Sequence, residues 1–178
     1  SGVWGCGSYT KIESIQNRAI RFYLGTHRFT PNLACWGDVG WLLAKDRRKL
    51  ELARLWNKLI NMNNARLTKR VFLWDKSFSA RSWCKDFYKV LEECGMSDLF
   101  SVNLPVNLST LKSCLYNNMK MQWTSDIQNV SKLRTYVKFK HEFKTEPYLH
   151  IVRNRQHRSA LAQLRCGVLP LRVETGHL

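Results

Sequence analysis

The sequence contains three clusters of lysine and arginine that could bind a ligand, because such cations bind and neutralise phosphate groups. The first is Lys45-Asp-Arg-Arg-Lys49, the second runs from Lys132 to Lys140, and the third is Arg153-Asn-Arg-Gln-His-Arg158. From these clusters we predict phosphate contacts by the following side chains: Lys45, Arg47, Arg48, Lys49, Lys132, Arg134, Lys138, Lys140, Arg153, Arg155 and Arg158.

The overall charge supports a polyanionic partner. The 178 residues include 29 Lys or Arg and 13 Asp or Glu, which gives a formal net charge of +16. A folded domain with this charge repels itself unless a polyanion supplies the counter-charge. Between residues 132 and 172, ten basic residues face only Glu142 and Glu146. Nucleic acid is the commonest partner for such a surface, and an anionic membrane is the second.

Each cluster also has a plainer interpretation. The second could be the solvated face of a helix; we expect its aromatic residues Tyr136, Phe139 and Phe143 to pack in the core and its cations to contact phosphates. The third could equally be a surface turn with incidental charge. The first lies at a predicted helix start, where cations oppose the helix dipole, so local stability does not account for it. A nuclear-import signal would use the same residues.

Signals for catalysis, metal binding and membrane insertion are missing from the sequence. It contains no Gly-rich phosphate loop, GxSxG or HExxH motif and no paired acidic residues beside a turn. The six cysteines form no CxxC pair, which is typical of reduced thiols in an intracellular protein. No apolar stretch approaches the ~20 residues that span a bilayer. We therefore predict no catalytic residues, no cofactor, no metal and no membrane or small-molecule partner, and we expect the protein in the nucleus and cytoplasm.

The isolated aspartates are interpreted as helix caps or solvated charges: Asp38, Asp46, Asp75, Asp86, Asp98 and Asp126.

Helical periodicity dominates the elements that must position these residues. A capping box at Thr10 and Glu13 predicts a first helix that ends at Gly25. A short helix after Pro31 should be broken at 37–40. Further helices are predicted over 43–62, 66–74, 82–94, from Asn107 or Ser109 to about Trp123, from Ser131 to Glu146, and over 156–166.

These elements predict an all-α fold, an irregular bundle of about seven or eight helices with a short extended C-terminal tail at 168–173. The segment 96–108 contains no Lys or Arg, and we place a domain boundary there, between residues 1–98 and 99–178.

Several motifs in a fixed order resemble the region that follows the reverse transcriptase core of animal non-LTR retrotransposons. They start with Gly2-Val-Trp-Gly5, Ile15-Gln-Asn-Arg-Ala-Ile-Arg-Phe-Tyr-Leu-Gly25, His27-Arg-Phe-Thr-Pro-Asn32 and Gly37-Asp-Val-Gly-Trp41. They continue with Lys132-Leu-Arg-Thr-Tyr136, Glu146-Pro-Tyr-Leu149 and the stretch from Arg158 to Gly176. The resemblance covers essentially the whole chain.

This resemblance implies a helical thumb and linker region that holds RNA, target DNA or an RNA–DNA hybrid during target-primed reverse transcription. The paired aspartates of the polymerase would lie upstream and a zinc knuckle downstream, so this segment is expected to be non-catalytic and to have the polymerase domain of its parent chain as a partner. The alternative is a helical protein–protein interaction scaffold that docks on the polymerase core or on a host protein. Exposed Trp or Leu stripes would favour that alternative.

Overall fold

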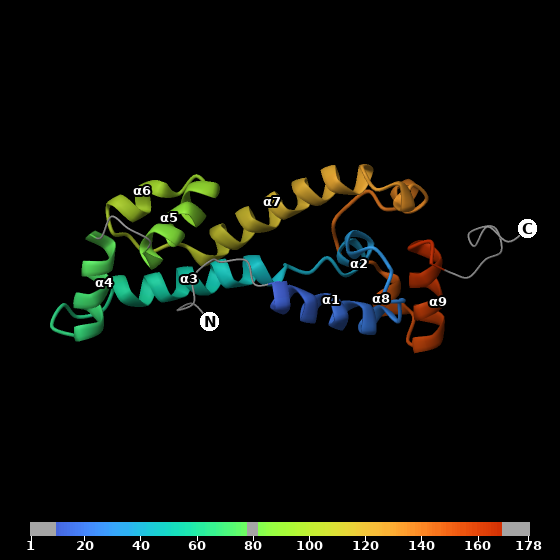
Figure 1. The fold of residues 1–178 in the computed structure, drawn as a ribbon, viewed down its shortest axis with the longest axis horizontal. Helices are drawn as coiled ribbons and strands as arrows, with labels where there is room; N and C mark the ends of the chain where they lie inside the picture. Colours follow the sequence, from blue (N-terminus) through green and yellow to red (C-terminus); the bar gives the residue numbers. More distant parts are fainter. Residues whose placement is uncertain (1–9, 78–81, 169–178) are drawn as a thin grey trace, which may run out of the picture. The chain divides into compact units, whose positions relative to one another are not determined.

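The computed structural model describes residues 10–77 and 82–168, and in this part of the chain every regular element is helical (Figure 1). The predicted all-α fold is therefore confirmed, with nine α-helices among the described residues where seven or eight were expected. The predicted extended tail lies outside the described residues except for Val168. The α-helices are α1 (Thr10–Leu24), α2 (Asn32–Val39), α3 (Ala44–Ile60), α4 (Leu67–Ser77), α5 (Trp83–Glu93), α6 (Ser97–Ser101), α7 (Leu108–Gln128), α8 (Tyr148–Ile151) and α9 (Arg155–Arg165). Two 3-10 turns, η2 (Ser131–Leu133) and η3 (Tyr136–Lys138), follow α7.

The chain forms two compact units. The described part of unit 1 comprises 43–77 and 82–117, and the described part of unit 2 comprises Thr10–Leu42 together with 118–168. This division differs from the predicted boundary near residue 98, because it falls within α7 and because unit 2 is assembled from two separate stretches of the chain.

Unit 1 is organised around an aromatic cluster on α3. Figure 1 shows α4 and α5 beside this helix. The Trp56 ring is completely buried, and its centroid lies 5.4 Å from that of Phe72, 5.1 Å from Phe87 and 5.0 Å from Phe100. The indole Nε1 donates a hydrogen bond to the Leu104 carbonyl at 3.0 Å. Burial of aromatic rings of this size contributes strongly to the stability of a small helical domain.

Side-chain caps start two helices of unit 1, and one of these caps was predicted. The Ser82 hydroxyl accepts a hydrogen bond from the Lys85 amide at 3.1 Å, at the start of α5. Of the two candidates before α7, Asn107 is the cap, because its side-chain oxygen accepts from the amides of Ser109 and Thr110. Each bond satisfies an amide that has no partner within its own helix.

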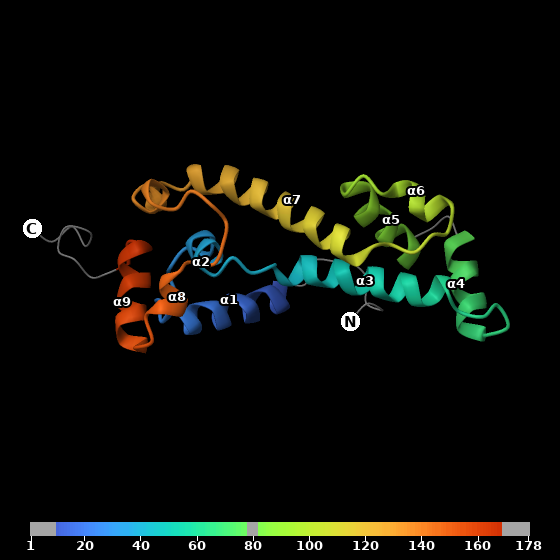
Figure 2. The same ribbon diagram turned by 180° about the vertical axis from the view of Figure 1, so that it is seen from behind.

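Unit 2 has a smaller apolar core. Figure 2 shows α1, α2, α8 and α9 gathered together. The core residues come from these four helices and are Ile20, Leu24, Cys35, Val39, Leu149 and Ala162. At the end of α1, the Gln163 side chain of α9 donates to the Gly25 carbonyl at 2.7 Å. Residues more than 130 positions apart thus form one small core.

Two predictions about local structure in unit 2 are wrong. Residues 37–39 do not break α2 but form its last turn, and Gly40 ends the helix with φ of 60° while its amide donates to the Trp36 carbonyl. The segment from Ser131 to Glu146 is not a helix but the turns η2 and η3 followed by irregular chain. Its apolar spacing of three residues matches the three residues per turn of a 3-10 helix as well as it matches an α-helix.

Candidate nucleic-acid interface

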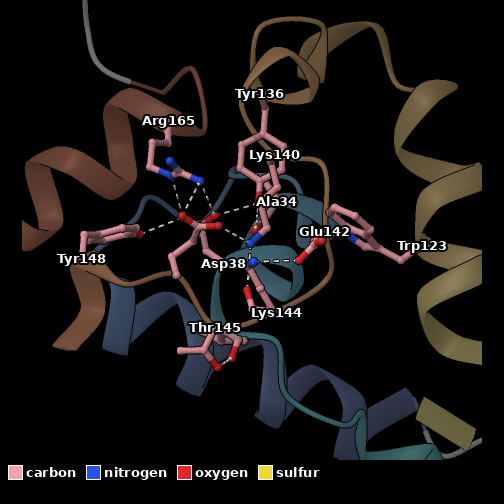
Figure 3. A network of polar contacts seen from close by, with 12 residues as sticks. Ala34, Asp38, Trp123, Tyr136, Lys140, Glu142, Lys144, Thr145, Tyr148 and Arg165 are labelled. Atoms are coloured by element: carbon pink, nitrogen blue, oxygen red, sulfur yellow. Dashed lines mark hydrogen bonds and ion pairs between the residues drawn. The ribbon is translucent and has the colours of Figure 1, made fainter. Parts of the chain in front are cut away.

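A buried carboxylate connects the segments that carry the cations of unit 2. Asp38, in the last turn of α2, has no solvent exposure. Its side chain accepts hydrogen bonds from the hydroxyls of Tyr136 in η3 and Tyr148 in α8, both at 2.7 Å. The Arg165 guanidinium of α9 approaches the same carboxylate at 3.4 Å. Figure 3 shows the three side chains converging on Asp38.

These contacts fix the protonation of the tyrosines. Burial raises the pKa of Tyr136 and of Tyr148, and the adjacent Asp38 carboxylate raises both further. Both hydroxyls therefore stay protonated and act as donors to Asp38. A buried carboxylate is costly unless it is paired and hydrogen-bonded, and here three donors meet that requirement.

Glu146 forms a second layer next to Asp38. Its backbone amide donates to the Asp38 carbonyl at 2.9 Å, and its carboxylate pairs with Arg165 at 3.0 Å. Lys140 pairs with the other Glu146 oxygen, and its ammonium also donates to the Lys144 carbonyl at 2.7 Å. Burial lowers the pKa of Lys140, and the hydrogen bond and charge of Glu146 act in the opposite direction.

Lys140 is therefore a correction to the predicted phosphate ligands. It is only 3% exposed and its ammonium is used within the chain, so it cannot reach a phosphate at the surface. The sequence could not distinguish Lys140 from Lys132 and Lys138, which are exposed, because all three stand in the same run of basic residues. In this structure Lys140 closes the 140–146 loop on itself, through Lys144 and Glu146.

Close backbone contacts complete the packing around α2. A Cβ atom on Gly37 would lie 2.6 Å from the Trp123 ring and 2.7 Å from the Tyr136 hydroxyl. A Cβ atom on Gly40 would lie 2.4 Å from the Thr145 amide nitrogen. Only glycine allows α2 to approach α7 and the 140–146 loop this closely.

The remaining predicted cations of unit 2 lie at the surface. Lys132, Arg134 and Lys138 are exposed on the segment that contains η2 and η3. Arg153 and Arg155 are exposed around the start of α9, where the Asn154 side chain caps the helix. The Asp38 network joins both segments to α2, so the second and third sequence clusters belong to one folded unit.

Arg158 differs from these exposed cations because it is half-buried. Its guanidinium carbon lies 5.3 Å from the centroid of the Tyr23 ring on α1. Its position stabilises the contact between α9 and α1.

The first sequence cluster lies in unit 1, on α3. Lys45 and Arg47 are exposed, and Arg48 is half-buried. Lys49 pairs with Asp46 at 3.6 Å and with Glu93 of α5. Lys49 therefore needs no partner phosphate to account for its charge, because carboxylates of the chain already neutralise it.

Sequence reasoning missed the importance of Asp38 and of several exposed aromatic rings. Asp38 was interpreted as a cap or a solvated charge, and the interpretation is wrong because Asp38 is fully buried. Flanking glycines at 37 and 40 are the signal that could have revealed a closely packed helix end. Tyr136 and Phe143 are buried as expected, but Phe139 is 47% exposed.

In the part of the chain that the structure describes, no three His, Cys, Asp or Glu side chains are grouped so that they could hold a metal ion. None of the described helices combines the length and the apolar character that crossing a bilayer requires. Comparison of the chain with protein-family models, with curated proteins and with solved structures finds no match in any of the three.

Proposed function

We propose that the chain is a non-catalytic nucleic-acid-binding segment that holds RNA or an RNA–DNA hybrid through phosphate contacts. The charge of unit 2 is the observation that carries the proposal. Residues 10–42 and 118–168 contain 14 Lys or Arg and five Asp or Glu, a net charge of +9. Three of these five acids, Asp38, Glu142 and Glu146, are engaged by Lys140, Lys144 and Arg165. Among the other charged residues of these two stretches, eleven are basic and only two are acidic.

The positions of the exposed cations support phosphate binding over a general solubilising role. Solvated surfaces usually mix both signs of charge. Here Lys132, Arg134 and Lys138 lie on a segment whose shape is fixed by the buried Tyr136, and Arg153 and Arg155 flank the capped start of α9. Cations on fixed backbone bind phosphates with less loss of conformational entropy than cations on a mobile tail.

The resemblance to the region after the reverse transcriptase core of non-LTR retrotransposons gives this proposal its context. In that context the segment would grip the template RNA, the target DNA or their hybrid next to the polymerase domain of its parent chain, in the nucleus or the cytoplasm. The motifs at 15–25 and 37–41 that carry the resemblance include α1 and the last turn of α2.

The test is the salt dependence of binding. Equilibrium binding to fluorescent single-stranded RNA, duplex DNA and an RNA–DNA hybrid should be measured between about 50 and 200 mM salt, a range over which phosphate-binding proteins lose affinity steeply. The triple variant Lys132→Gln, Arg134→Gln, Lys138→Gln should weaken binding to each probe and reduce the slope of log K against log salt by about one per lost contact.

Arg54→Gln is the matched control. Arg54 is exposed but pairs with Glu51 on α3, so its removal should leave the salt slope nearly unchanged. A wild-type protein that binds none of the probes at low salt, or binds them with a flat salt response, would contradict the proposal.

One observation favours the alternative, a protein-docking surface in unit 1. Leu67, Val71 and Trp74 follow one another at helical spacing on α4 and are 73%, 54% and 61% exposed. An apolar row of this kind on a helix is typical of a protein interface. Under this alternative, a purified polymerase core of the parent element would bind the chain with little salt dependence, and Trp74→Ala would abolish that binding while leaving RNA binding intact.

A further inference from the structure

Two phenylalanine rings on the surface of unit 2 each lie against an arginine. Phe22, near the end of α1, is 71% exposed, and Phe29, in the following loop, is 70% exposed. The guanidinium carbon of Arg155 lies 4.8 Å from the centroid of the Phe22 ring, and that of Arg28 lies 4.6 Å from the centroid of the Phe29 ring. We name Phe22, Arg155, Arg28 and Phe29 the ring surface.

The two rings lie on one short stretch of chain, whose ends are joined by a side chain. The Arg21 side chain donates to the Thr30 carbonyl at 3.1 Å and to the Asn32 side chain at 2.6 Å. Arg21 directly precedes Phe22, and Thr30 directly follows Phe29, so the loop is tied back to the end of α1.

Arg155 reaches the ring surface through tertiary structure. It lies 133 residues after Phe22 and comes from α9, which packs on the end of α1 through Gln163 and Gly25. The Phe22 pair therefore depends on the packing of unit 2 and is not a feature of local sequence.

Exposed rings beside guanidinium groups are suited to stacking on nucleic-acid bases. Every base has a π-face, and single strands, unlike duplexes, leave that face open to aromatic side chains and to arginine planes. Two exposed α1 cations, Arg18 and Lys11, lie four and eleven residues before Phe22 and so share its helix face. Arg18 lies about 6 Å along the helix axis from Phe22, within reach of the phosphates of a strand that stacks on the ring.

We propose that the ring surface binds unpaired bases of a single-stranded nucleic acid, while Arg18 and Lys11 contact its phosphates. The proposal rests on the nucleic-acid binding proposed above and adds that bases contribute to affinity along with phosphates. It selects single strands over duplexes, because a duplex stacks its own bases and cannot present their faces.

The experiment compares two single strands that have the same number of phosphates, and a duplex. They are a labelled single strand of about 12 nucleotides, an abasic strand of the same length, and a blunt duplex, the first in both RNA and DNA form. Wild-type protein should bind the normal strand about five-fold or more tightly than the abasic strand, since stacking on one aromatic side chain contributes that much. The double variant Phe22→Leu, Phe29→Leu should lose this difference and bind the abasic strand and the duplex as before.

Two control variants separate stacking from a loss of fold. Phe22→Trp keeps a ring at the position and should retain the preference for the normal strand. Leu67→Ala removes an equally exposed apolar side chain from unit 1 and should change no affinity. Circular dichroism of each variant checks that the helices remain.

The outcomes distinguish this inference from the proposed function. Equal wild-type affinity for the normal and abasic strands, or unchanged discrimination in the leucine double variant, overturns base stacking but leaves phosphate binding in place. Failure of the wild type to bind any probe at low salt overturns both.

Discussion

Each of the two units of this chain is stabilised internally by a different kind of interaction. In unit 1, the rings of Phe72, Phe87 and Phe100 surround Trp56, and the attraction between them depends on contact area more than on direction. In unit 2, three side chains from three segments point at the single carboxylate of Asp38. Hydrogen bonds require a definite distance and angle, so the unit 2 arrangement specifies position as well as proximity.

The difference follows from the regular structure that each unit contains. The core of unit 1 is built by helices whose backbone groups satisfy one another. In unit 2, the chain between α7 and α8 forms only two 3-10 turns, and it carries the exposed Lys132, Arg134 and Lys138. A segment without a helical hydrogen-bond ladder needs another source of order, and Asp38, Glu146 and their partners supply it. Aromatic packing thus suffices where helices already fix the backbone, while the polar network is needed where they do not.

The largest effect that tests this comparison is expected from Asp38→Ala. The substitution removes the acceptor that two buried hydroxyls and a guanidinium share. Arg165 keeps Glu146 and Tyr136 keeps the Ala34 carbonyl, but the Tyr148 hydroxyl loses its acceptor and a charge pair is broken, which should cost about 3–5 kcal/mol of stability. Amide hydrogen exchange read by mass spectrometry should show lost protection in peptides from 10–42 and 129–168. Trp56→Ala should cost about 3–5 kcal/mol as a large-to-small core substitution, with lost protection in peptides from 43–107.

Asp98→Ala is the control for the loss of a carboxylate, because Asp98 is exposed on α6 and its removal should cost little. Loss of protection across both units in Asp38→Ala, at the level seen in its own unit, would show that the two cores are not separate and would break the comparison.

A smaller effect is expected from a pair of glycine substitutions. Gly40 and Gly95 have nearly the same backbone, with φ of 60° and 65°. A Cβ at Gly40 would meet the backbone of Thr145 and Lys144, while a Cβ at Gly95 would meet nothing within 4 Å. Gly95→Ala should therefore cost only the strain of a left-handed alanine, about 1 kcal/mol, and Gly40→Ala should cost about 2 kcal/mol more. Urea unfolding of both variants measures the difference. Equal costs would mean that the 140–146 loop moves away from the added methyl group at little cost.

The last effect is absent at neutral pH and appears only in the alkaline range. Unfolded tyrosine ionises near pH 10, but the raised pKa values keep Tyr136 and Tyr148 protonated in the folded state. The unfolded state then binds fewer protons, so stability should fall as pH rises above 10, by about 1.4 kcal/mol per pH unit for each tyrosine. Burial lowers the pKa of Lys140, which contributes in the opposite sense but as a single group.

Urea unfolding between pH 8 and 11 tests this dependence. The double variant Tyr136→Phe, Tyr148→Phe should start from lower stability at pH 8, because it lacks two hydrogen bonds, but should lose stability less steeply above pH 10. Burial also raises the pKa of Cys35 to about 11, and this thiol contributes an alkaline slope that both proteins share. An identical slope for the two proteins would mean that the tyrosines ionise freely in the folded state.

Sequence patterns predicted those features that depend on neighbouring residues. The helical spacing of Leu52, Trp56 and Leu59 predicted α3, and Asn107 was one of two predicted starts of α7, because periodicity and capping act over a few residues. The partners of Asp38 lie 98 to 127 residues away, and no local pattern connects them.

The same limit applies to the candidate site. A run of basic residues does not reveal which member turns inward, so Lys140 and Lys138 could not be told apart. The sequence does not reveal that Phe22 is exposed, because its neighbours Ile20 and Leu24 are apolar residues of a buried helix face.

The order of synthesis follows from the way that unit 2 is divided along the chain. The described part of unit 1, within residues 43–117, is translated between the two parts of unit 2, so Trp56 and its neighbours can pack as soon as these residues have emerged. The pair between Asp38 and Arg165 cannot form until Arg165 has been synthesised, 127 residues later, which takes about 6 to 25 s at typical elongation rates. During that interval α1 and α2 lack their partners, and the folded unit 1 serves as a compact spacer that shortens the loop still to be closed. A chain terminated near residue 117 would contain a complete unit 1 and an Asp38 carboxylate with none of its three donors.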